Sequence, residues 1–106
     1  IFFFFSTGSN NTQSVIQSPS SEHRPEGESV SLHCRFTVSF DQYVMSWFQQ
    51  LSNRKMTEII NIHSSSTKTE KGRYFVSHQK GNKALSLTIT GLMPIDSGIY
   101  FCAVRE

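Results

Sequence analysis

The sequence predicts an all-β fold of two sheets packed face to face, and three observations carry this prediction. Short apolar runs alternate with polar residues at a period of two, as strands with one buried face do. Turn-forming residues interrupt these runs, and no segment keeps a helical period. The chain has 106 residues, 37% of them hydrophobic and 17% charged, which suits one small globular domain. Several short strands separated by turns are typical of a β-sandwich.

The first ten residues differ in composition from the rest of the chain. Five apolar residues, four of them consecutive Phe, precede small polar residues. A secretory signal peptide ends in this way, with an apolar region and then a small-residue cleavage zone. We therefore expect residues 1–10 to be a signal-peptide remnant and residues 11–106 to be the domain. The alternative is an N-terminal hydrophobic strand. Glycosylation at the Asn10 sequon, which falls in the same zone, stays open.

The first half of the domain contains the most regular strand. A short apolar run at residues 14–17 ends at Pro19, and residues 24–28 form a turn. Residues 29–36 then alternate cleanly, with Ser, His and Arg on the outward face. The inward face of this strand is expected to carry Val30, Leu32, Cys34 and Phe36.

The second half contains five further expected strands. They lie at residues 44–51, 57–62, 73–77, 84–90 and 98–104. The pleat of the first of them places Met45 and Trp47 on one face and Phe48 and Gln50 on the other. In the fourth, the inward residues are Leu85, Leu87 and Ile89. Irregular or turn segments separate the strands, including a corner at residues 91–97.

Charge and side-chain chemistry argue against several classes of function. The formal net charge is only +2, and the basic residues form no stripe, which argues against a nucleic-acid partner. No nucleophile-elbow motif and no carboxylate cluster is present, so neither catalysis nor a cofactor is expected. No apolar run reaches the roughly 20 residues of a membrane span, so any anchor lies outside this chain. The four histidines, which lack metal-ligand spacing, are His23, His33, His63 and His78.

The two cysteines lie on expected strands, and an aromatic residue lies near each of them in the sequence or on the next strand. Cys34 and Cys102 are too far apart in sequence for a compact zinc knuckle, which leaves either a disulfide or two separate buried thiols. Trp47 follows Cys34 on the next strand, and Tyr100 precedes Cys102 by two residues. An Asp-Ser-Gly sequence beginning at Asp96 leads into this last strand.

This constellation resembles the immunoglobulin variable (V-set) domains, over about residues 13–106. Residues 13–19 are similar to the N-terminus of T-cell receptor alpha chains, and residues 47–50 match the family's Trp-aromatic-x-Gln. Residues 85–89, followed by residues 96–106, give the strongest match. The final Cys-Ala-Val-Arg-Glu is similar to the end of alpha or alpha/delta variable segments.

The resemblance implies an immunoglobulin variable-type two-sheet Greek-key sandwich, in which Cys34 and Cys102 form the disulfide between the sheets. It also implies that Arg73 and Asp96 form an ion pair at the base of the sandwich. The alternative for these two residues is a pair of separate surface charges. The core residues implied by the family frame are Trp47, Leu87 and Tyr100.

The chain departs from the family at two places. Residues 51–55 lack the Pro-Gly turn common there. A complete variable domain also has a final strand with a Phe-Gly-x-Gly bulge, whereas this chain stops at Arg105 and Glu106. We therefore expect a sandwich lacking the final (G) strand, truncated at the start of the third antigen loop, as in a germline variable segment or a truncated product. Residues 98–104 should then expose an unpaired apolar edge, and an added joining strand should rescue solubility and folding.

An outward apolar patch is expected on the sheet that carries Trp47. The equivalent patch in the family pairs with a partner variable domain, and a soluble monomer should not expose such a surface. The alternative is that each residue is simply a half-exposed strand residue. The patch is expected to consist of Phe48, Gln50, Met56 and Phe101.

The antigen-facing loops are assigned to residues 38–43, residues 63–68 and the start of a third loop at residues 104–106, with residues 77–83 as a peripheral fourth. Aromatic residues offer rigid contact area and polar residues adaptable hydrogen bonds. The alternative is that the missing third loop dominates specificity. The candidate contact residues are Phe40, Asp41, Gln42, Tyr43, His63, Ser64, Ser65, Ser66, Arg105 and Glu106.

The resemblance thus implies an antigen-recognition domain of a T-cell receptor alpha-type chain, which pairs with a beta-type chain and binds peptide presented by a major histocompatibility molecule. Such a chain enters the secretory route, lies on the extracellular side of the plasma membrane and reaches signalling subunits through regions outside this sequence. Two alternatives remain: an invariant V-set adhesion or co-receptor domain with a fixed cell-surface ligand, and an immunoglobulin light-chain variable domain.

Overall fold

The computed structural model describes residues 2–5, 8–9, 13–18, 21–38, 41–50, 54–79, 81 and 84–105. The elements in chain order are β1 (Phe2–Phe5), β2 (Gly8–Ser9), β3 (Gln13–Ser18), β4 (Ser21–His23), β5 (Val30–Val38), β6 (Val44–Gln50), β7 (Met56–His63), β8 (Lys68–Lys71), β9 (Tyr74–Gln79), β10 (Ala84–Ile89), the short 3-10 helix η2 (Pro94–Asp96) and β11 (Gly98–Arg105). The prediction of an all-β fold is confirmed.

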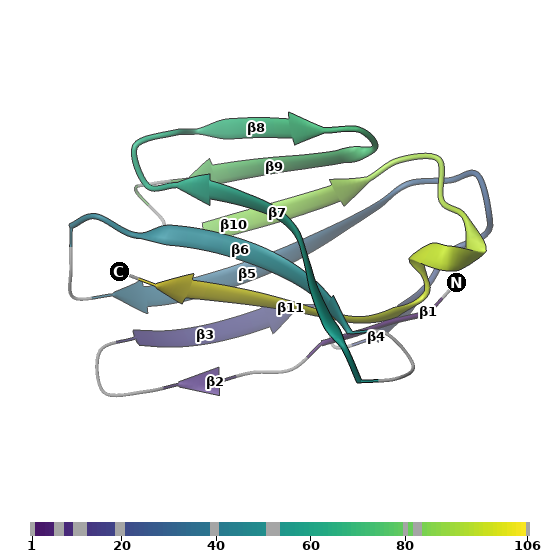
Figure 1. Ribbon diagram of the computed structural model, residues 1–106, viewed down its shortest axis with the longest axis horizontal. Helices are drawn as coiled ribbons and strands as arrows, with labels where there is room; N and C mark the ends of the chain where they lie inside the picture. The colour runs from purple at the N-terminus through teal and green to yellow at the C-terminus, as the bar shows by residue number, and fades with distance from the viewer. Residues whose placement is uncertain are drawn as a thin grey trace.

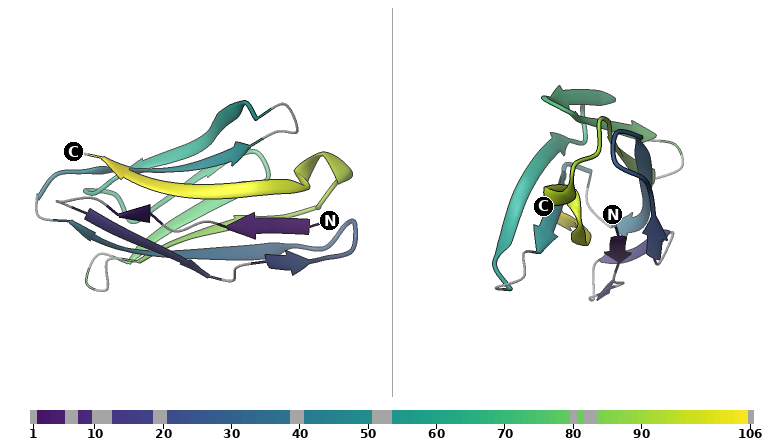
Figure 2. Two further views of the ribbon diagram at one scale, coloured as in Figure 1. Left: turned by 90° about the horizontal axis from the view of Figure 1, so that it is seen from below. Right: turned by 90° about the vertical axis from the view of Figure 1, so that its right-hand side faces the viewer.

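The strands form two sheets. One has the order β4-β1-β11-β6-β7 and the other the order β2-β3-β5-β10-β9-β8. Seen end-on, they make two layers, with β8 and β9 lying at the edge where the layers approach each other (Figure 2). β5, β7, β9 and β11 all end, and β6 begins, at the left end of the sandwich in Figure 1. That end is therefore the one where the predicted ligand loops gather.

The period-two alternation of the sequence accounts for the core. The inward residues of β5 from Val30 to Phe36, and those of β10, are at most 4% exposed. On β5, the residues between them, Ser31, His33 and Arg35, are exposed. β5 and β10 pair antiparallel, with Leu85 opposite Cys34 and Leu87 opposite Leu32. The buried residues of both sheets form one cluster, which includes Trp47, Leu87 and Tyr100 as expected. Burial of this apolar surface is the main favourable term in the folding of the domain.

A disulfide joins the two sheets through this core. It links Cys34 of β5 with Cys102 of β11, with 6.5 Å between their Cα atoms. Trp47 lies opposite Cys102 in the β6–β11 ladder and is fully buried. The alternative of two separate thiols is therefore excluded.

Two expectations about strands need correction. Lys68 was expected at the end of a loop and residues 69–71 were assigned to no strand, but residues 68–71 form β8, which pairs antiparallel with β9. The edge of β11 was expected to be unpaired along its length, yet β1 pairs with it in parallel at Gly98, Ile99 and Tyr100. β1 pairs on its other side with β4. Cleavage of residues 1–10 as a signal peptide stays a prediction, because strand pairing does not test it.

Within the part of the chain that the structure describes, no helix has both the length and the apolar character needed to cross a membrane.

Candidate binding surfaces

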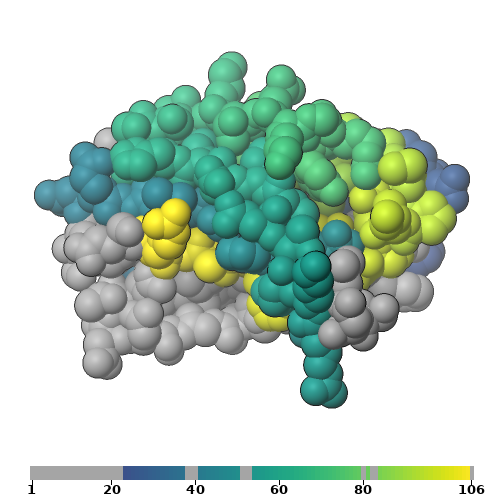
Figure 3. All heavy atoms as spheres, in the orientation of Figure 1, coloured from purple at the N-terminus to yellow at the C-terminus, as the bar shows by residue number. Residues whose placement is uncertain are grey.

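The outer face of the β11-β6-β7 sheet brings together the residues of the predicted apolar patch. Phe48 of β6 lies directly opposite Phe101 of β11, and Gln50 lies opposite Met56 of β7. Met56 is 44% exposed, and the other three side chains are half-buried. Figure 3 views this face and shows atoms of β11 (yellow) next to those of β6 and β7 (blue to teal). We call Phe48, Gln50, Met56 and Phe101 the sheet patch.

A β-bulge shapes the border of the sheet patch. The β6–β7 register shifts between Trp47 and Phe48, so that Trp47 lies opposite Ile60 but Phe48 lies opposite Glu58. The extra residue, Ile59, is buried, as Ile60 is. A bulge of this kind places two residues of one strand against one of the other. An exposed carboxylate therefore stands beside Phe48, where it accepts a 2.6 Å hydrogen bond from Asn61.

Ile99 is a further member of this surface that the sequence prediction omitted. It lies opposite Gln50 and is half-buried. The alternation that turns Tyr100 and Cys102 inward also turns Ile99 outward, beside Phe101. That signal was available in the sequence.

The predicted ligand loops divide into exposed and buried residues. Asp41, Gln42, His63, Ser65, Ser66 and Arg105 are exposed, and they lie at the end of the sandwich where β5, β7 and β11 end (Figure 1). Phe40 and Glu106 lie outside the described residues. All six of these exposed residues are polar or charged.

Two of the predicted contact residues, Tyr43 and Ser64, are not available to a ligand. Tyr43 is 5% and Ser64 3% exposed. The Tyr43 ring packs edge-on against Phe36, and the Tyr43 amide donates to Ser64 Oγ. Burial raises the pKa of the Tyr43 hydroxyl. The prediction that these two side chains contact a ligand directly is therefore wrong, because both are used inside the domain.

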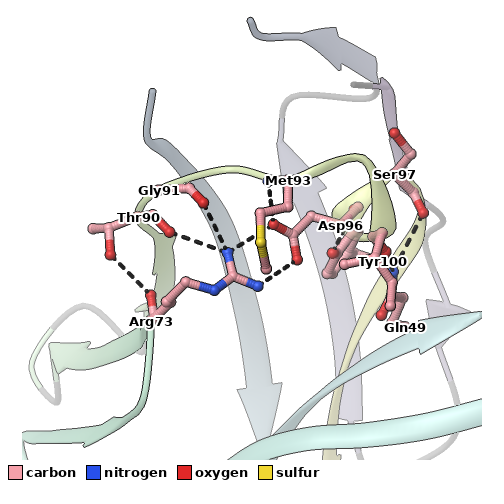
Figure 4. A network of polar contacts seen from close by, with 9 residues as sticks. Gln49, Arg73, Thr90, Gly91, Met93, Asp96, Ser97 and Tyr100 are labelled. Atoms are coloured by element: carbon pink, nitrogen blue, oxygen red, sulfur yellow. Dashed lines mark hydrogen bonds and ion pairs between the residues drawn. The ribbon is translucent and has the colours of Figure 1, made fainter. Parts of the chain in front are cut away.

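At the opposite end of the sandwich, Arg73 and Asp96 form the ion pair that the resemblance implies (Figure 4). Arg73 Nη1 lies 2.7 Å from Asp96 Oδ2, and Arg73 Nη2 lies 2.9 Å from Asp96 Oδ1. The same guanidinium donates to the carbonyl oxygens of Thr90 and Gly91. Paired hydrogen bonds between a guanidinium and a carboxylate fix geometry as well as adding energy.

The Asp96 carboxylate is buried, which makes its partners important. Burial raises the pKa of this carboxyl, but hydrogen bonds from Arg73 and from the Met93 amide, at 2.9 Å, lower it more. The result is a pKa below the ordinary value. Hydrogen bonding to Asp96 in turn raises the pKa of Arg73. The Tyr100 hydroxyl donates to the Asp96 carbonyl oxygen at 2.6 Å, which ties the corner back to β11.

Gln49 fixes the same corner from β6. It is 8% exposed, and its Nε2 donates to the carbonyl oxygens of Ile95 at 3.1 Å and Ser97 at 3.3 Å. Gly98 follows with φ +151°, and a Cβ there would lie 3.2 Å from the Gln50 carbonyl oxygen. This backbone conformation and the close approach explain why a glycine begins β11.

Replacing Gln49 by Met is expected to lower the free energy of unfolding by roughly 1–2 kcal/mol, because the side chain keeps its length but both hydrogen bonds to the corner are lost. Urea denaturation of the chain measures this change. The matched control is Gln50→Met, since the neighbouring amide points outward and its loss should change stability by less than about 0.5 kcal/mol. Equal losses in the two variants would contradict the role given to Gln49.

Among the described residues, no group of three or more His, Cys, Asp or Glu side chains is placed to hold a metal ion.

A two-sheet sandwich with an inter-sheet disulfide, a buried Trp beside it and a Tyr bonded back to the preceding corner is typical of an immunoglobulin domain. The family model of the immunoglobulin V-set domain matches residues 17–106. The chain therefore belongs to the immunoglobulin V-set family.

Its curated relatives narrow the class further. The chain is 39% identical over 95 residues to the mouse T-cell receptor alpha chain V region 2B4, covering 90% of this chain and 70% of that relative. It is 33% identical to human T cell receptor alpha variable 14/delta variable 4, over 93% of this chain and 86% of the relative. It is 37% identical to human T cell receptor alpha variable 29/delta variable 5, over 89% and 78%.

Proposed function

We propose that the chain is the antigen-recognition variable domain of a T-cell receptor alpha-type chain, and that it pairs with a beta-type chain to bind peptide presented by a major histocompatibility molecule. The observation that carries the proposal is the sheet patch, an aromatic pair with an adjacent amide on the outer face of a sheet. The relatives named above, which are alpha and alpha/delta variable regions, supply the receptor class.

The chemistry of the sheet patch favours a second protein domain. An antiparallel sheet that faces water carries polar residues on its outer face. Here Phe48 and Phe101 face each other across β6 and β11, and Met56 is 44% exposed. Interfaces are enriched in such aromatic and Met side chains around their centres. The Gln50 amide can both donate and accept, so it can pair with an equivalent amide of a partner.

The exposed polar residues at the loop end suit a ligand of mixed polar character. Asp41, Gln42 and Arg105 together offer an anion, an amide and a cation, which are groups that paratopes use for adaptable hydrogen bonding. We therefore propose binding rather than catalysis as the function, without a cofactor. A structural disulfide persists in oxidising compartments, which supports a position on the extracellular side of the plasma membrane. Contact with signalling subunits would use regions outside this chain.

Substituting Phe101 by Arg is expected to raise the dissociation constant for a beta-type partner at least about 30-fold, because a central aromatic contact is lost and a charge is introduced into an apolar interface. Co-expression followed by surface plasmon resonance or size-exclusion chromatography measures pairing. Phe75→Arg is the matched control, since Phe75 is a half-buried aromatic residue on β9 in the other sheet.

An unchanged dissociation constant for Phe101→Arg would exclude the sheet patch as the pairing surface. Equal losses in the two variants would indicate general damage instead. A wild-type chain that binds no beta-type partner but binds one invariant cell-surface protein would favour an adhesion or co-receptor domain.

A further inference from the structure

One histidine lies buried beneath the ligand end of the sandwich. His78 of β9 is 3% exposed and shares the inward face of its strand with Val76. The alternation of the strand predicts an apolar residue there, and a buried polar group persists only where it is hydrogen-bonded. The partners of His78 come from two different predicted ligand loops, those of residues 38–43 and 63–68.

The imidazole of His78 reaches both loops at once. Its Nδ1 lies 3.1 Å from the Ser66 carbonyl oxygen, and because a carbonyl can only accept, Nδ1 carries the hydrogen. Its Nε2 lies 3.4 Å from the Tyr43 hydroxyl, within hydrogen-bond distance. The His78 backbone amide also donates to the Thr67 carbonyl oxygen at 2.8 Å. One side chain therefore holds the end of the first loop and the middle of the second.

Aromatic packing fixes the orientation of this ring. Phe36 stacks on His78 with the ring centroids 6.1 Å apart, and it meets Tyr43 edge-on at 5.5 Å. Tyr43 and His78 are themselves edge-on at 5.9 Å. Edge-on and stacked contacts have defined geometries, so the three rings hold the two hydrogen-bonding atoms of His78 in position.

The two loops also meet directly, through two hydrogen bonds between Tyr43 and Ser64. The Ser64 amide donates to the Tyr43 carbonyl oxygen at 2.8 Å, and the Tyr43 amide donates to Ser64 Oγ at 3.2 Å. Movement of either loop away from the other would break these bonds and one of the two side-chain contacts of His78. The groups form a connected network, in which the loss of one member weakens the others.

We propose that His78 is a positioning residue that couples the first and second ligand loops, so that they present one rigid surface. The proposal rests on the proposed function in that it takes these loops to be the ligand-facing ones. A Phe or Leu at this position would fill the same volume but leave the Ser66 carbonyl oxygen and the Tyr43 hydroxyl without this partner. The coupling therefore needs an imidazole and not only an apolar side chain.

Replacing His78 by Phe tests the coupling, because the ring is kept and both polar contacts are removed. Amide hydrogen exchange, resolved by mass spectrometry on the whole chain, is expected to become roughly tenfold faster in both residues 41–44 and residues 64–67. Exchange in β10 should stay unchanged. His33→Phe is the matched control, since His33 is exposed on the outer face of β5, and it should leave both loops unchanged.

Tyr43→Phe separates coupling from local damage and keeps the test valid if His78→Phe unfolds the chain. It removes only the hydroxyl, whose 3.4 Å contact with His78 Nε2 connects Tyr43 to the second loop, so exchange in residues 64–67 should also become faster. In the double variant the effect should not exceed that of His78→Phe alone, since the two groups act through one contact.

Acceleration confined to one loop, or fully additive effects of the two substitutions, would overturn the proposal. These measurements use neither a partner chain nor a ligand. If the exchange results contradicted the coupling, the proposed receptor function would be unaffected. If the chain failed to pair with a beta-type partner, the exchange results would still hold.

Discussion

Replacing Asp96 by Ala is expected to lower the free energy of unfolding by roughly 2–4 kcal/mol. Breaking a buried ion pair on one side costs about 3–5 kcal/mol, and the partial exposure of Arg73 reduces this cost. Asp96 is 2% exposed in its side chain and Arg73 32%. The substitution also removes the acceptor of the Met93 amide. Urea denaturation at neutral pH measures the loss, and Asp41→Ala, at an exposed loop position, is the matched control with an expected change within about 0.5 kcal/mol.

The pH dependence of stability gives this prediction a second readout. Hydrogen bonds from Arg73 and Met93 outweigh burial and hold the pKa of Asp96 below its ordinary value. The stabilisation is therefore fully present above the unfolded-state pKa of about 3.9, and it is lost as the pH falls through the lower folded-state pKa. The difference in unfolding free energy between the wild type and Asp96→Ala should narrow below about pH 4. Parallel profiles down to pH 2 would show that Asp96 does not contribute through its charge.

Alternation in the sequence was sufficient to predict the central strands, because each has one buried face. β5, β6 and β10 lie within one or two residues of their expected bounds. β8 was missed, since Lys68–Lys71 is largely polar and exposed and carries no such pattern. It is a strand because its backbone pairs with β9. An edge strand that is held mainly by backbone hydrogen bonds needs no alternation of apolar and polar side chains, so the sequence pattern does not predict it.

For the candidate surfaces too, the sequence predicts what depends on strand alternation and misses what depends on contacts between distant residues. The sheet patch could be predicted from the alternation of side chains along a strand, because Phe48 and Gln50 must face away from Trp47. The misassignment of Tyr43 and Ser64 has a different cause. Tyr43 contacts Phe36 and also His78, which lies 35 residues away in sequence, and Ser64 is hydrogen-bonded to Tyr43. No local pattern in the first loop indicates a partner on a distant strand. The burial of such loop residues can be recognised only from the three-dimensional arrangement of the strands that pack against them.

Removing the disulfide with the double variant Cys34→Ala and Cys102→Ala is expected to lower the free energy of unfolding by roughly 4 kcal/mol. The bond joins residues 68 positions apart, and closing so long a loop restricts the unfolded chain by about this amount in the chain-entropy model. A domain of this size has a total stability of roughly 5–15 kcal/mol. The variant should therefore keep only roughly 1–11 kcal/mol, and its midpoint of thermal unfolding should fall clearly below that of the wild type. Circular dichroism during thermal unfolding measures the change.

The double variant is the informative one, because a single substitution would leave a buried free thiol. Leu85 lies opposite Cys34 in the β5–β10 ladder, and Leu85→Ala is the matched comparison, since it removes core volume without removing the cross-link. Cavity formation of that kind costs about 2–5 kcal/mol and acts on the folded state. Loss of the disulfide acts largely on the unfolded state, so a larger exposed area on unfolding should raise the denaturant m-value of the double variant alone. If the double variant were within about 1 kcal/mol of the wild type, packing around Trp47, and not the disulfide between the sheets, would be the main stabilising contribution to the sandwich.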